Sequence, residues 1–78
     1  MQRYANLSGE SGIVAFEIGD GSLVVEFVER DGAERYYRYT AASAGAKNLA
    51  EMQRRARRGR GLATFIAQHA PPYADKWR

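Results

Sequence analysis

The sequence predicts a single small α+β domain, in which a three-stranded antiparallel β-meander is followed by two helices packed on one face of the sheet. The first half of the chain contains three runs of β-branched and aromatic residues separated by glycine turns, and the second half has apolar residues at helical spacing. With 78 residues, 45% of them hydrophobic, the chain can build one compact core and no second one. We expect residues 1–78 to form this β-β-β-α-α domain, with a core over residues 11–68 and flexible ends. The aromatic residues of the C-terminal tail, Tyr73 and Trp77, either dock on the domain or fray.

The first two strands are expected at residues 13–18 and 22–29, joined by Asp20-Gly21, a strong signal for a two-residue hairpin loop. This loop pairs Phe16 with Val25. Because side chains alternate along a strand, two apolar sets then share the core face of the sheet. They are Val14, Phe16 and Ile18 from the first strand, and Leu23, Val25 and Phe27 from the second.

The third strand is expected at residues 33–40, and its register depends on the loop before it. A two-residue loop would place Arg38 inward, opposite Val25, and would bury an unpaired charge. A three-residue loop places Tyr37 opposite Val25 instead, and uses Gly32 in the left-handed conformation of a glycine bulge. The three-residue loop therefore puts Tyr37 and Tyr39 on the core face, and Tyr36 and Arg38 on the outer face.

The second half of the chain is predicted to form two helices. Ser43 is the expected N-cap of the first helix, which runs from Ala46 to Gly59. The second helix begins after Gly61 and is stopped by Pro71-Pro72. Their apolar positions are Leu49, Met52 and Ala56 in the first helix, and Leu62, Phe65 and Ile66 in the second.

Several short motifs in this order are shared with a known small domain. They are Ser11-Gly12-Ile13 with Phe16, the alternating Leu23, Val25 and Phe27, the pair Tyr37 and Tyr39, the run Ala42 to Gly45, and the glycine-flanked helix from Gly59 to Ile66. On these motifs, residues 11–68 resemble the KTSC domain, which is named for the C-terminal extension of some lysyl-tRNA synthetases. The resemblance implies a stand-alone cytoplasmic protein of a bacterium or phage. An RNA-binding role has been suggested for that family.

Charge is distributed unevenly along the chain. Residues 1–39 hold four Lys or Arg and seven Asp or Glu, a net of −3, whereas residues 40–78 hold eight and two, a net of +6. Five arginines fall within the seven positions from Arg54 to Arg60. Favourable interaction with the helix dipole and with Glu51 explains about two of these arginines, so the remainder indicates an anionic partner.

The favoured hypothesis is a small binding module that contacts RNA mainly through phosphates, because guanidinium groups match phosphate bidentately. The candidate phosphate contacts are Lys47, Arg54, Arg55, Arg58 and Arg60, and Tyr36 and Arg38 are candidates for base or sugar contact. The alternative is a protein-interaction adaptor that binds an acidic protein partner through the apolar outer face of the sheet or through an edge strand. An accessory domain with a regulatory partner is a third possibility.

Other functional classes find little support in the composition. The chain has one histidine, His69, and no cysteine, and no His, Asp or Glu cluster has the spacing of metal ligands. We therefore expect no catalytic residues, no metal and no cofactor. Apolar runs span only a few residues and the N-terminus lacks the apolar region of a secretory signal, so we expect a cytoplasmic protein with no membrane partner.

Overall fold

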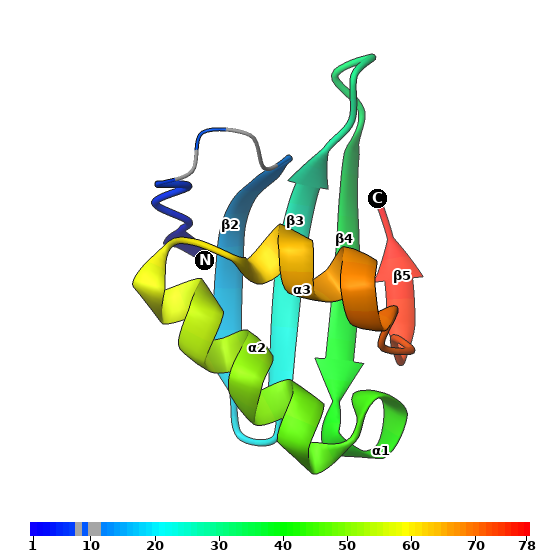
Figure 1. Cartoon of the computed structure of the whole chain (residues 1–78). Coiled ribbons are helices and arrows are strands. Elements are labelled where there is room, and N and C mark those ends of the chain that lie inside the picture. Colours follow the sequence, from blue (N-terminus) through cyan, green and yellow to red (C-terminus); the bar gives the residue numbers. More distant parts are fainter. Residues whose placement is uncertain (8, 10–11) are drawn as a thin grey trace.

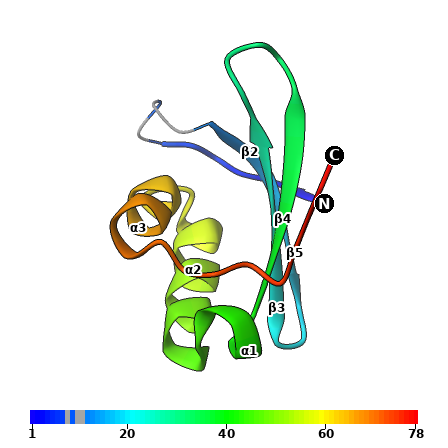
Figure 2. The ribbon, with the colours of Figure 1, turned by 90° about the vertical axis from the view of Figure 1, so that its right-hand side faces the viewer.

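The computed structural model describes residues 1–7, 9 and 12–78, which form one antiparallel sheet covered on one face by helices (Figure 1). Five strands lie in the order β1-β2-β3-β4-β5 within this part of the chain. The elements are β1 (Gln2–Arg3), β2 (Ile13–Gly19), β3 (Ser22–Val28), β4 (Glu34–Thr40), α1 (Ala41–Ala44), α2 (Ala46–Arg58), α3 (Leu62–His69) and β5 (Asp75–Trp77). The three helices lie on the same side of the sheet and form a helical layer, while the opposite, outer face of the sheet carries no helix in the described part of the chain (Figure 2). The predicted α+β class, strand order and helix order are confirmed, with two short edge strands and one short helix added.

The register of the central hairpins agrees with the prediction. Phe16 pairs with Val25 across β2 and β3, and Tyr37 pairs with the same Val25 across β3 and β4. The Glu29 amide donates to the Ala33 carbonyl at 2.8 Å, which closes a three-residue loop of Arg30, Asp31 and Gly32, and Gly32 has a φ of +85°. The Gly32 amide donates to the Glu29 carbonyl at 2.9 Å, so this glycine occupies the left-handed position expected for the bulge.

A β-bulge in β2 reverses part of the predicted facing. Ile13 pairs with Phe27 whereas Ala15 pairs with Glu26, so Val14 is an extra residue in the ladder. Ile13 is consequently buried and Val14 is 39% exposed. The prediction that Val14 lies on the core face, with Ile13 opposite, was wrong because strict alternation fails at a bulge.

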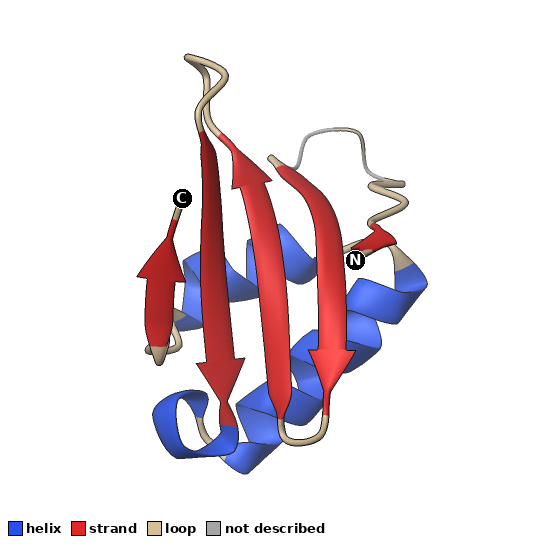
Figure 3. Cartoon of the chain, turned by 180° about the vertical axis from the view of Figure 1, so that it is seen from behind, coloured by secondary structure: helices blue, strands red, loops and turns tan. Residues whose placement is uncertain are grey.

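Both ends of the chain are edge strands. The C-terminal tail docks on the sheet, where β5 pairs antiparallel with β4. At the other edge β1 pairs with β2, and Tyr4 just beyond it is 3% exposed. The Tyr4 ring packs edge-on against Phe16, and its hydroxyl accepts a hydrogen bond from the Leu62 amide at 3.3 Å. Figure 3 shows the two edges from the outer face.

The predicted N-cap at Ser43 was also wrong. Thr40, the last residue of β4, is the N-cap of α1, and its hydroxyl accepts a hydrogen bond from the Ser43 amide at 3.1 Å. Ser43 completes a capping box in return, because its hydroxyl accepts from the Thr40 amide. Gly45 then separates α1 from α2, and Gly59 ends α2 with a φ of +76°, as predicted.

The core lies between the sheet and the helical layer. The apolar positions predicted for the helices are all buried except Ile66, which is partly buried against the core. The buried apolar residues are Tyr4, Ile13, Phe16, Leu23, Val25, Tyr39, Ala44, Leu49, Met52, Ala56, Leu62 and Phe65.

Candidate nucleic-acid interface

The arginine run lies where α2 turns into α3. Gly59 and Gly61 both have positive φ, and the left-handed turn they make sends the chain from the end of α2 into α3. A hollow of ≈ 350 Å³ lies beside this turn. We call it the arginine pocket; it is lined by Arg55, Arg58, Arg60, Gly61 and Thr64.

Arg55 joins the two helices that form the pocket. Its guanidinium donates to the Glu51 carboxylate at 2.6 Å and to the Gly61 carbonyl at 2.9 Å. It also lies over the Phe65 ring, 5.0 Å from the centroid. Because the side chain is only 29% exposed, Arg55 has a structural role in addition to presenting a positive charge to the pocket.

Glu51 is shared by two of the predicted phosphate contacts. Arg54 donates to it from one helical turn away, at 3.1 Å from Nε, in addition to the contact from Arg55. The hydrogen bonds from Arg54 and Arg55 lower the pKa of the Glu51 carboxyl to about 2. Arg54 is more than half exposed, so it remains accessible at the surface although its charge is partly offset.

Arg58 and Arg60 are exposed, and neither forms an ion pair with any residue that the structure describes. They are the strongest candidates for an anionic ligand. Lys47 is exposed at the other end of α2, about 16 Å from Arg58 along the helix axis, and does not reach the pocket. Arg57 was not among the predicted contacts. It is exposed in the last turn of α2, next to Arg58 in the sequence, and is not one of the residues that line the pocket.

Tyr36 and Arg38 lie on the outer face of the sheet and are not brought together with the arginines. Tyr36 stacks on Trp77, with centroids 5.7 Å apart and planes 10° apart, and its hydroxyl lies 3.2 Å from Glu34 and 3.3 Å from Glu26. Arg38 forms an ion pair with Asp75 and donates to it from Nε at 2.7 Å. Each side chain therefore already has partners within the domain. Because Tyr36 and Arg38 alternate with Tyr37, which faces the core, they lie on the side of the sheet opposite the helical layer that holds the arginine pocket.

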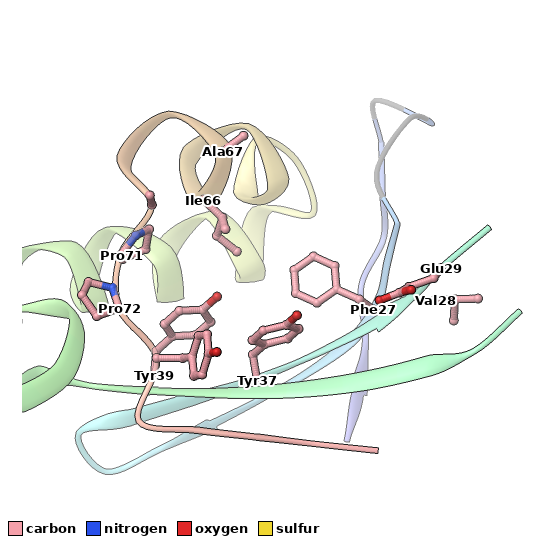
Figure 4. A pocket seen from close by; sticks show the side chains of 11 residues that line it. Phe27, Val28, Glu29, Tyr37, Tyr39, Ile66, Ala67, Pro71 and Pro72 are labelled. Atoms are coloured by element: carbon pink, nitrogen blue, oxygen red, sulfur yellow. The ribbon is translucent and has the colours of Figure 1, made fainter. Parts of the chain in front are cut away.

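A second, larger hollow was not predicted. This tyrosine cleft, of ≈ 600 Å³, lies between the sheet and α3 and is open at one side (Figure 4). The sequence predicted Tyr37 and Tyr39 on the core face. Tyr39 is buried, which raises the pKa of its hydroxyl to about 12, and Tyr37 is partly buried against the core. The lining residues are Phe27, Val28, Glu29, Tyr37, Tyr39, Ile66, Ala67, Ala70, Pro71, Pro72 and Tyr73.

Residues 1–7, 9 and 12–78 contain no group of three side chains suited to hold a metal ion. None of the helices in the same residues is long and apolar enough to cross a membrane. No protein-family model, curated protein or solved structure matched the chain.

Proposed function

We propose that the protein is a non-enzymatic nucleic-acid-binding module that holds RNA phosphates in the arginine pocket. One observation carries this proposal: three arginines, Arg55, Arg58 and Arg60, line a single hollow. Residues 41–70, which include the helical layer, carry six Lys or Arg and one Asp or Glu, a net of +5. A site of this charge favours a polyanion over a neutral partner.

The lining of the pocket also suits phosphate recognition in detail. Arginine presents a planar fork of donors that matches two phosphate oxygens. The Thr64 hydroxyl and the backbone at Gly61 add neutral polar groups at the beginning of α3. Contacts of this kind position a nucleic acid without reading its sequence. We therefore expect weak sequence preference.

The resemblance to the KTSC domain, which remains a prediction, points in the same direction. It implies a small RNA-associated protein in the cytoplasm of a bacterium or of a phage-infected cell. The proposal itself depends on the pocket and does not require that assignment.

The test is a double variant, Arg58→Gln with Arg60→Gln, which removes the two pocket charges while keeping a polar side chain at each position. Binding to single-stranded RNA and to a tRNA hairpin is measured by fluorescence anisotropy over a range of salt concentrations. For single strands, the slope of log K against log salt should fall by roughly 0.7 for each lost phosphate contact. Affinity should weaken alike for unrelated sequences.

The matched control is Arg3→Gln with Arg30→Gln, which removes the same charge from two exposed positions, one in β1 and one in the loop between β3 and β4. This control should keep most of the binding. Equal losses in both double variants would reduce the effect to net charge and would contradict a pocket. If the wild-type protein binds no RNA tighter than about 0.1 mM near physiological salt, the proposal is wrong and an adaptor for an acidic protein becomes the leading hypothesis.

A further inference from the structure

The tyrosine cleft has the composition of a small-ligand site rather than of a packing defect. Its floor is formed by the rings of Phe27 and Tyr37, which meet edge to face with centroids 5.3 Å apart, together with Tyr39 (Figure 4). Ile66 of α3 points into the cleft from the opposite side, and the Pro71-Pro72 segment closes one end. The volume of ≈ 600 Å³ lies within the usual range for ligand pockets.

The tyrosine hydroxyls of the cleft lack protein partners among the residues that the structure describes. The hydroxyls of Tyr37, Tyr39 and Tyr73 form no hydrogen bond with any side chain or backbone group in the described part of the chain. Glu29 lies at the other end of the same cleft and forms an ion pair with Arg35 at 3.7 Å. Apolar walls with a few convergent hydrogen-bonding groups are typical of sites that orient a small ligand.

We propose that the tyrosine cleft binds one planar heteroaromatic ring of the nucleobase type. Aromatic side chains provide surfaces on which such a ring can stack, and the tyrosine hydroxyls can donate to ring nitrogens or exocyclic oxygens. An acyl chain would fit the apolar walls but would leave the three tyrosine hydroxyls without partners, which is costly. The ring chemistry is therefore favoured over a purely aliphatic ligand.

A free nucleoside and a base of bound RNA present the same ring to the cleft. The cleft and the arginine pocket flank the same helix, since Thr64 lines the pocket and Ala67, one turn later, lines the cleft. If the ring belongs to bound RNA, this inference rests on the proposed function. If it belongs to a free nucleoside, the inference does not depend on the proposed function.

The first experiment titrates the full chain with adenosine and with uridine, using ribose alone as the control, and follows backbone amide resonances by NMR. Shifts should saturate and should concentrate at Ala67, Ala70 and Tyr73. Absence of shifts up to the solubility limit of both nucleosides, or equal shifts with ribose, would overturn the proposal.

Two variants then locate the site. Ile66→Trp fills the cleft, and Tyr73→Ala removes a ring that is 48% exposed and packs edge-on against Tyr37. Each should weaken nucleoside binding about fivefold or more, the lower end of what one base–aromatic contact contributes. If either variant is folded, as judged by its melting, and binds nucleosides like the wild type, the cleft is not the site.

The variant with both Arg58→Gln and Arg60→Gln separates the two proposals. It should bind adenosine as the wild type does, whatever its effect on RNA. If Ile66→Trp weakens both adenosine and RNA binding, the ring belongs to the bound strand. If it weakens adenosine binding alone, the ligand is a free heteroaromatic compound. A loss of adenosine affinity in the double arginine variant equal to that in Ile66→Trp would place the ring elsewhere and contradict the cleft assignment.

Discussion

Tyr4 is the residue through which the N-terminal segment is expected to stabilise the domain. Its side chain is 3% exposed, and its hydroxyl accepts the hydrogen bond from Leu62 described above. Tyr4→Phe removes only that acceptor and should lower the free energy of unfolding by about 0.5–1.5 kcal/mol. Tyr4→Ala removes the buried ring as well and should cost about 3–5 kcal/mol, the range for large aromatic truncations. A 78-residue domain has a total stability of roughly 4–12 kcal/mol, so the second variant should be close to unfolding.

Urea denaturation followed by circular dichroism measures both changes, with the slope against urea checking that the unfolded state is unchanged. Leu7→Ala is the control, because Leu7 lies in the same segment but is 65% exposed, and its cost should stay within about 0.5 kcal/mol. A cost below about 1 kcal/mol for Tyr4→Ala would show that the segment does not dock, and would refute the reasoning.

Three further predictions concern a glycine and two titrating groups. Gly59→Ala should destabilise the protein more than Gly32→Ala. Both positions have positive φ, but only at Gly59 would the added Cβ meet Ala5, at 2.5 Å. Equal unfolding free energies for the two variants would contradict that contact. The Glu51 carboxyl, whose pKa is lowered from 4.5 to about 2, contributes stability that is present above pH 4.5 and lost as the pH falls toward 2. Glu51→Gln should therefore reduce the fall of the melting temperature between pH 4.5 and pH 2. An unchanged fall in the variant would argue against the shared ion pairs. The Tyr39 hydroxyl, whose pKa is raised from 10 to about 12, contributes stability below pH 10 that is lost as the pH rises to 12. Tyr39→Phe should remove that alkaline loss, and the tyrosinate absorbance that appears near pH 12 should be smaller in the variant.

The sheet was predictable where local rules decide the outcome. Glycine turns fixed the lengths of both hairpin loops, and the cost of burying Arg38 selected between two registers for the third strand. The facing of Ile13 and Val14 was not predictable in this way, because a bulge adds one residue to a ladder without a reliable sequence signal. The cap at Thr40 was missed for a related reason: the strand ends directly in a helix, so no loop separates the two patterns.

The candidate sites depended more strongly on tertiary structure. The arginine run was visible as composition, and its position at a glycine-bounded turn between helices followed from the sequence. The different roles of the arginines in this run could not be predicted, because Arg55 is held in place by the Gly61 carbonyl, six residues later, and by the Phe65 ring. The tyrosine cleft combines residues from β3, β4, α3 and the segment after α3, and no spacing along the chain relates them.

The two layers of the fold carry opposite charge, and this bears on where a nucleic acid could bind. Residues 12–40, which form β2, β3 and β4, hold three Arg and six Asp or Glu, a net of −3, against the +5 of residues 41–70. On the outer face, Tyr36 already lies within hydrogen-bonding distance of two carboxylates. A polyanion should therefore be attracted to the helical layer and repelled from the outer face. On the proposed function, the arginine pocket and the tyrosine cleft beside α3 would share one strand of RNA, whereas Tyr36 and Arg38 belong to a different surface, where Trp77 and Asp75 attach the C-terminal strand to the sheet.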